Sequence, residues 1–293
     1  MTNSVANTVC NKHSFHHRIF RKSVLIGRFF ILIWLLVVHT CLSFEVLADA
    51  SDISGHSCHA PDYHETAKSR HVIDGDTIIL ADDRHVRLIG INAPEIGHDG
   101  KASQAGAIRA RNFLKQLLKK FQTVHLVYDK ERYDRYQRTL AHLFLPDGIN
   151  VQAELLRQGV ATPLTIPPNL TFLNCYQDNA NSARNKNKGL WALPDYKPIP
   201  VDKISSRESG YRIIIGRVLR IGDSSSAIWV NLTPDIALRI VREDLVYFNN
   251  IDLKGLEGKI VQARGWLQHH GREHRMRIRH PVDLVVLPDT TGN

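Results

Sequence analysis

Two carboxylates that could hold a metal ion lie in the segment HVIDGDTIIL, residues 71–80. Asp74 and Asp76 flank Gly75, and their carboxylate oxygens could bind a metal ion. An Asp-Gly pair between apolar runs is also a strong hairpin signal, because glycine adopts the positive φ that a tight turn needs. A hairpin explains Asp74 and Gly75 but not the second carboxylate. The segment alone therefore leaves a plain turn and a metal site on a turn both open.

Charged and polar side chains lie near the ends of predicted strands in two further segments. RLIGINAPE, residues 87–95, places Arg87 at one end of a predicted strand, with Asn92 and Glu95 beyond the other end. YDRYQRTLAHLF, residues 133–144, places Arg138 at the start of another strand. Taken alone, each residue has a plain interpretation: Arg87 on a solvated strand face, Glu95 in a turn after a rigid proline, and Arg138 in a surface cluster with Asp134 and Arg135.

The elements that must position these side chains are mostly strands up to residue 145. Alternation of polar and apolar residues predicts a hairpin over 70–80 and strands over 84–91, 123–129 and 139–145. Apolar residues at helical spacing predict an amphipathic helix over 102–120. Two further helices, 150–158 and 170–188, are predicted to stop at Gly159 and Gly189.

The motifs VIDGDT, RLIGINAPE, DRYQRTLAHLF, ELLRQGVA and NKGLWA occur in the order and approximate spacing of the thermonuclease family, the staphylococcal-nuclease-like enzymes. The resemblance covers about residues 68–193. It implies a fold that is mainly β with helices (α+β), a five-stranded OB barrel packed with three helices. It also implies phosphodiester hydrolysis in DNA or RNA with one calcium ion.

The resemblance assigns roles by position in the motifs. Asp76 would be the first calcium carboxylate and Asp74 a supporting acid, with Asn92 and the backbone carbonyl of Ala93 completing the ligands. Glu95 would activate or position the attacking water. Two arginines, Arg87 and Arg138, would clamp the phosphate, a use that fits the planar guanidinium.

The chain departs from the family pattern in two places. Many relatives have aspartate where this chain has Asn92, and the change removes one negative charge while keeping an oxygen ligand. The tyrosines that some relatives place after RQGxA are absent from RQGVATPLTIPPN. Tyr136, next to Arg135, remains as a candidate contact to the phosphate or sugar of the substrate.

The N-terminus resembles an export signal. Basic residues precede the uncharged stretch 29–44, which is shorter than the roughly 20 residues of a membrane-spanning helix, and Val46-Leu47-Ala48 has the small-residue spacing of a cleavage site. We therefore expect a signal peptide over residues 1–48 and a periplasmic or secreted protein, with a membrane anchor through residues 24–47 as the alternative. The leader holds five of the 38 basic and one of the 29 acidic residues, so the rest carries a net charge of +5, which tolerates a polyanion.

Cysteine usage agrees with export. Removal of the leader leaves only Cys58 and Cys175, which an oxidising compartment would allow to form one disulfide. Cys58 also lies near His56, His59 and His64, a spacing that could bind a transition metal, although a flexible polar segment over residues 49–67 is the simpler interpretation.

Beyond the predicted catalytic domain, residues 68–195, a stretch rich in proline, serine and charge predicts a linker over 196–209. Short strands then predict a small closed or half-closed OB-like β-barrel over 210–289. Strand alternation in HRMRIR places Arg275, Arg277 and Arg279 on one face, which either tracks a nucleic-acid backbone or is simply solvated.

The sequence thus predicts an exported, calcium-dependent nuclease with nucleic acid as its partner, and indicates no protein partner. One alternative is a nucleic-acid-binding protein of the same fold that does not cut, favoured only by Asn92. Another is a metal-scavenging or adhesive surface protein that uses its histidines.

Overall fold

The computed structural model describes residues 58–288. The predicted leader, the first part of the segment 49–67 and the last five residues lie outside the described residues. Within the described part, no helix is long and apolar enough to cross a membrane.

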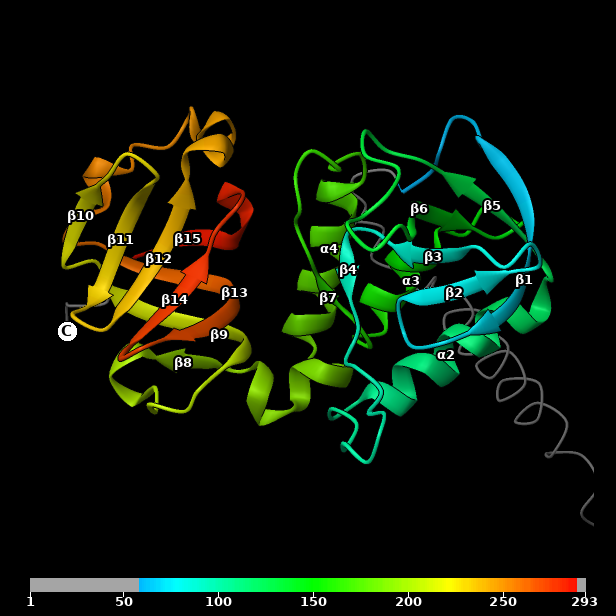
Figure 1. The fold of residues 1–293 in the computed structure, drawn as a ribbon, viewed down its shortest axis with the longest axis horizontal. Coiled ribbons are helices and arrows are strands. Elements are labelled where there is room, and N and C mark those ends of the chain that lie inside the picture. Colours follow the sequence, from blue (N-terminus) through cyan, green and yellow to red (C-terminus); the bar gives the residue numbers. More distant parts are fainter. Residues whose placement is uncertain (1–57, 289–293) are drawn as a thin grey trace, which may run out of the picture. The chain divides into compact units, whose positions relative to one another are not determined.

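Five strands of the N-terminal half close into a barrel in the order β1-β2-β3-β6-β5 (Figure 1). They are β1 (Glu65–Val72), β2 (Thr77–Leu80), β3 (His85–Leu88), β5 (Thr123–Val127) and β6 (Thr139–Phe144). Neighbouring strands are antiparallel except β3 and β6, which run parallel. Fully buried residues such as Ile78, Leu88 and Leu126 fill the interior, because alternate side chains of each strand point inward. The prediction of a five-stranded barrel is confirmed.

Three helices pack on this barrel: α2 (Ala107–Lys120), α3 (Val151–Arg157) and α4 (Leu173–Asn185). Helix α2 begins five residues later than predicted, because Gly106 at its N-terminus has a φ of 91° and ends the helical backbone there. Gly159 adopts positive φ just past the end of α3, as predicted, whereas α4 ends at Asn185, before the predicted end at residue 188, and Gly189, also at positive φ, begins a 3₁₀ helix. These two glycines also touch, and Leu190 N donates to Gly159 O at 2.7 Å, which joins the ends of the two helices.

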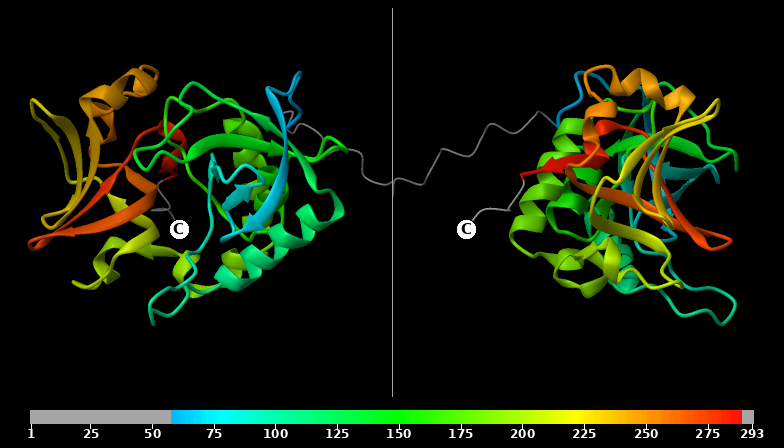
Figure 2. Two further views of the ribbon diagram at one scale, coloured as in Figure 1. Left: turned by 45° about the vertical axis from the view of Figure 1, so that its right-hand side comes forward. Right: turned by 90° about the vertical axis from the view of Figure 1, so that its left-hand side faces the viewer.

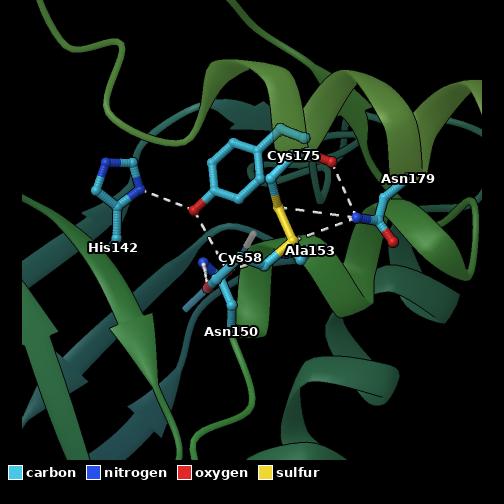
Figure 3. The surroundings of a disulfide bond; sticks show 7 residues. Cys58, His142, Asn150, Ala153, Cys175 and Asn179 are labelled. Atoms are coloured by element: carbon cyan, nitrogen blue, oxygen red, sulfur yellow. Dashed lines mark hydrogen bonds between the residues drawn. A yellow bond between two sulfur atoms is a disulfide. The ribbon is translucent and has the colours of Figure 1, made fainter. Parts of the chain in front are cut away.

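A disulfide joins Cys58, near the start of the described chain, to Cys175 on α4 (Figure 3). Asn179 lies beside it and donates to the backbone oxygen of Cys175 at 2.9 Å. The predicted disulfide is confirmed, and Cys58 is therefore not a free thiolate for a transition metal.

The C-terminal strands form an eight-stranded sheet that curls round a second core. Its main path is β10-β11-β12-β14-β13-β9-β8, and β15 also pairs with β13 (Figure 1). Figure 2 shows these strands, coloured from yellow-green to red, in two further views. The strands are β8 (Pro198–Pro200), β9 (Gly210–Arg217), β10 (Arg220–Asp223), β11 (Ala227–Thr233), β12 (Ile236–Val241), β13 (Ile260–His270), β14 (Glu273–Arg277) and β15 (Leu284–Leu287).

Two details of this half differ from simple expectation. The apolar run 211–221 is divided between β9 and β10, and the predicted linker contributes β8, which pairs parallel to β9.

The two halves also share contacts: Arg184 of α4 donates to the side-chain oxygen of Gln262 on β13 at 2.9 Å, and Arg264 donates to Gln177.

Candidate active site

The loop that carries the two aspartates joins β1 to β2. The side chain of Asp74 accepts a hydrogen bond from the backbone N–H of Asp76 at 3.0 Å, which fixes the turn. Gly75 is required for a reason other than the predicted one, since its φ is not positive. A Cβ at this position would lie 2.5 Å from the Cβ of Ala93 and 2.6 Å from that of Ala110, so only glycine lets the loop approach both.

Asp76 is buried, with 3% of its surface exposed. Its Oδ2 accepts a hydrogen bond from the backbone N–H of Ala93 at 2.7 Å and lies 3.0 Å from Nη2 of Arg87. Burial, helped by the neighbouring Asp74 and Glu95, raises its pKa to about 7 against the opposing effect of Arg87. A nearby cation stabilises the charged form of a buried carboxylate beside two other acids, because the cation offsets the mutual repulsion of the acids.

A short strand pair, which the sequence pattern does not predict, positions Asn92 and the following residue, Ala93, whose N–H binds Asp76. Strand β4 (Ile91–Asn92) pairs antiparallel with β7 (Thr162–Pro163). Nδ2 of Asn92 donates to the backbone oxygen of Ala93 at 3.2 Å. The amide therefore presents its nitrogen to the other predicted ligand, and a half-turn of the amide would present the oxygen instead.

Glu95 follows on an exposed corner, where Gln104 holds the backbone. The side chain of Gln104 accepts from Glu95 N at 2.9 Å, and Gln104 N donates to Glu95 O at 3.0 Å. Partial burial and Asp74 raise the pKa of Glu95, while Arg87 and Arg138 act in the opposite direction. Gln104 was not predicted as part of the site, and nothing in the sequence distinguishes it from other polar residues before a helix.

The side chain of Arg87 is only 12% exposed, so the interpretation as a solvated strand residue is wrong. Its guanidinium donates to the backbone oxygens of Leu88 at 2.6 Å and Ile91 at 3.0 Å, in addition to its contact with Asp76. These bonds hold it in one orientation at the end of β3.

Arg138 immediately precedes β6, which runs parallel to β3 with Arg87 opposite Leu140. Its Nε donates to Oδ2 of Asp134 at 2.7 Å, so the surface cluster considered for this residue does exist. Asp134 also accepts from the backbone N–H groups of Tyr136 and Arg138. Asp134 therefore holds Arg138 in place, whereas the sequence indicated Asp134 only as a member of a surface charge cluster.

A cavity of about 590 Å³ brings together both arginines and the predicted substrate contacts Arg135 and Tyr136. Tyr136 is 64% exposed, and its hydroxyl accepts a hydrogen bond from Arg135 at 2.6 Å. Asp74, Asp76 and Glu95 do not line this cavity. They lie next to it, because Asp76 contacts Arg87 directly.

The donors around Asp76 fit calcium in kind. A carboxylate, an amide oxygen and a backbone carbonyl are ligands that a hard cation prefers. The set is poor in charge, and among residues 58–288 no three His, Cys, Asp or Glu side chains are grouped as a metal site. The oxygens of Asp76, Asn92 and Ala93, with Asp74 beside them, are the atoms that would hold the ion.

The predicted C-terminal arginines line a second cavity of about 610 Å³. Arg275 and Arg277 share one face of β14, whereas Arg279 lies beyond the end of that strand. Arg277 pairs with Glu243 at 2.6 Å and with Asp244 at 2.8 Å, and Arg275 pairs with Glu273 at 2.9 Å. Their charge is therefore partly neutralised.

Comparison with known proteins agrees with this geometry. The model of the family described as staphylococcal nuclease homologue matches residues 85–193. A thermonuclease of Staphylococcus intermedius is 36% identical over 125 residues, which are 42% of this chain and 73% of that protein. A thermonuclease of Staphylococcus hyicus is 33% identical over 131 residues, covering 44% and 76%. An uncharacterized endonuclease of Escherichia coli O157:H7 is 35% identical over 136 residues, covering 44% and 77%. The chain therefore belongs to the thermonuclease family, the staphylococcal nuclease homologues.

Proposed function

We propose that the protein is an exported, calcium-dependent nuclease that hydrolyses phosphodiester bonds of DNA, RNA or both. The observation that carries the nuclease proposal is the contact of buried Asp76 with both Ala93 and Arg87, next to Glu95 and Arg138. Carboxylates that can bind a cation and guanidinium groups that can bind a phosphate are thereby joined in one site.

Each residue has a role that its surroundings support. Calcium, when bound by Asp76, Asn92 and Ala93, supplies positive charge beside the phosphate. Arg87 and Arg138 offset the negative charge that grows on the phosphate oxygens in the transition state. Glu95 accepts the proton of the attacking water as the water oxygen bonds to phosphorus. The bond between phosphorus and the leaving oxygen breaks, and that oxygen takes up a proton from the solvent. The raised pKa of Glu95 makes it a stronger base than an ordinary carboxylate.

A binding protein that does not cut is the second candidate, and Asn92 is the feature that favours it. The presence of Arg87, Glu95 and Arg138 argues against it, because binding alone needs no general base. One assay separates the two. The full chain is incubated with labelled single-stranded DNA, duplex DNA and RNA, in calcium, in magnesium and in excess chelator. Cleavage only with calcium supports the proposal, cleavage in chelator contradicts the calcium part, and binding without cleavage under every condition supports the second candidate.

Export is supported by the leader and by the Cys58–Cys175 disulfide, which suits an oxidising compartment. Cell fractionation followed by N-terminal sequencing tests it. A mature protein that begins at Asp49 in the periplasm or medium supports export with cleavage after Ala48. A chain that keeps Met1 in the membrane fraction supports an anchor through residues 24–47, and a chain in the cytoplasm contradicts export.

A further inference from the structure

We infer that the outer face of β11, β12 and β14 binds a single-stranded part of the nucleic-acid substrate, with Trp229 as the ring on which a base stacks. The inference rests on the proposed nuclease function, because the strand that it holds is the substrate's own.

The residues of this face are set by strand alternation. Val230 and Leu232 on β11 point into the second core, so Trp229 and Asn231 point outward. Arg239 on β12 lies directly opposite Trp229. Arg275 on β14 lies one strand further, opposite Ala237.

Trp229 is held in place as a platform. Its Nε1 donates to the hydroxyl of Ser224 at 3.2 Å. The guanidinium of Arg239 lies 5.6 Å from the ring centre and that of Arg275 lies 5.2 Å from it, both within the range of a cation–π contact. On the other neighbouring strand, β10, the residue opposite Trp229 is Gly222. Since glycine has no side chain, β10 places no side chain against the ring at this position.

The free positive charge of this face belongs to residues that were not predicted. Among residues 58–288, neither Arg220, opposite Asn231, nor Arg239 forms an ion pair with an acid, whereas Arg275 and Arg277 do. Unpaired guanidinium groups next to an aromatic ring are the combination that tracks a phosphate backbone while bases stack.

The face continues into the candidate active site. The second cavity is lined by Arg239, Arg275 and Trp266 and also by Asn92 and Arg135. It shares four residues with the cavity that contains Arg87 and Arg138, namely Arg135, Leu164, Ile166 and Arg279. A strand that leaves the cleaved phosphate therefore has a lined path to Arg239 and Arg275, the two residues whose guanidinium groups lie over the ring of Trp229. An unpaired base can stack on the ring, whereas the bases of a duplex are already stacked on each other, so the site selects single strands.

The test measures binding of a labelled 20-nucleotide oligothymidylate by the full mature chain. The Glu95→Gln substitution is present in every protein so that the oligonucleotide stays intact. We expect Trp229→Leu to weaken binding roughly 10-fold, the scale for losing one base–aromatic stack. Gly222→Leu should do the same while leaving Trp229 in place, because the new side chain covers the ring. Arg239→Gln should reduce the salt dependence of binding by about one phosphate contact.

Lys254→Gln is the matched control for charge, since Lys254 is exposed in the 3₁₀ helix Lys254–Leu256, outside this face. Thermal melts show which variants are folded. The inference is overturned if the folded variants among the three bind the oligonucleotide as the parent does, or if Trp229→Leu weakens binding of a 20-base-pair duplex by the same factor.

Failure of the proposed function gives a different result. The protein with Glu95 intact is assayed on bis(4-nitrophenyl) phosphate, a phosphodiester too small to reach Trp229. Hydrolysis of this substrate by the unsubstituted protein shows a working catalytic site, so that a failed binding test refutes only the inference. No hydrolysis of this substrate or of nucleic acid by the unsubstituted protein refutes the proposed function.

Discussion

Arg87 and Asp76 form a buried ion pair, in which Nη2 of the arginine lies 3.0 Å from Oδ2 of the aspartate. The proposed phosphate clamp and the proposed calcium ligand therefore position each other before any substrate arrives. Removing one partner of a buried pair leaves the other charge uncompensated, which costs several kcal/mol. Variants at these positions must for that reason be checked for folding before their activity is interpreted.

Asp76 and Glu95 should fail in different ways. Asp76→Asn keeps the shape of the side chain and an acceptor for Ala93 N–H but removes the buried charge, so calcium binding and turnover should both be lost. Glu95→Gln should keep most of the calcium affinity and lose turnover, because it removes the base and not a ligand. Calorimetric titration with calcium and single-turnover cleavage measure the two effects. Asp147→Asn, at an exposed carboxylate, is the matched control, and full turnover in Glu95→Gln would refute the mechanism.

The two arginines should not be replaceable by lysine. Arg87→Lys and Arg138→Lys keep the positive charge but lose the planar fork, so each should slow cleavage by ~10²-fold, the scale for losing one preorganised donor. The rate of a saturated, single-turnover reaction measures the loss. Arg157→Lys serves as control, because Arg157, at the end of α3, pairs with Glu154 and with no other acid in the part of the chain that the structure describes. Lysine variants that cut at the rate of the unsubstituted protein would show that charge alone is sufficient.

The catalytic barrel could be predicted from sequence because its motifs are local. Asp74, Gly75 and Asp76 occupy one turn, and strand alternation places the core. The pair β4–β7 could not be predicted, since two-residue strands carry no periodicity, and it is this pair that brings Asn92 beside Thr162. Partners distant in sequence were missed for the same reason.

On the predicted C-terminal face, the sequence pattern gives the side of the strand on which the arginines lie but not the acids that pair with them. Alternation correctly places Arg275 and Arg277 on one side of β14. It does not reveal that Glu243 and Asp244 pair with Arg277. That contact depends on where the 3₁₀ helix that carries both acids, Arg242–Phe248, lies relative to β14. Nor does alternation reveal that β11 and β12 bring Arg239 to Trp229.

The disulfide should make a large contribution to stability. It links residues separated by 117 positions, and a cross-link of that span restricts the unfolded chain by an amount worth about 2–5 kcal/mol. The Cys58→Ala, Cys175→Ala double variant should therefore unfold at a clearly lower urea concentration with little change in cleavage rate below the transition. The unsubstituted protein treated with a reducing agent should behave alike. Equal urea midpoints for the double variant and the oxidised protein would contradict this.

Acid should destabilise the barrel through Asp129. Burial alone would raise its pKa, but contacts from His142 and Thr171 lower it from 3.8 to about 2. Its Oδ2 accepts from Thr171 N at 2.9 Å and lies 3.6 Å from Nε2 of His142. The other ring nitrogen of His142, Nδ1, is hydrogen-bonded to the hydroxyl of Tyr176 (Figure 3). The folded protein thus binds this proton more weakly than the unfolded chain does. Stability from this group is present above about pH 4 and is lost as the pH falls towards 2.

Urea unfolding between pH 5 and pH 3 measures this loss. The slope of stability against pH should be smaller in Asp129→Asn than in the unsubstituted protein, and the missing part should be about 1 kcal/mol over this pH range. Burial also lowers the pKa of His142, so protonation of this residue destabilises the folded protein below about pH 6.5. The Asp129→Asn variant should still show this second loss of stability. Asp147→Asn is again the control of equal charge. Parallel slopes for Asp129→Asn and the control would refute the assignment.

Asn92→Asp should increase the affinity of the site for calcium. The amide adds no charge to a ligand set in which Asp76 is the one buried carboxylate, and calcium affinity rises with the charge of its ligands. In the absence of calcium, the second carboxylate should raise the pKa of Asp76 further by repulsion. The variant should therefore need less calcium for half-maximal cleavage, and the gain should shrink as the pH falls below 7. Asn187→Asp, on an exposed turn after α4, adds the same charge away from the site and should change nothing. Activity measured over a calcium series at two pH values provides the test, and an unchanged or higher calcium requirement would show that Asn92 is not a ligand.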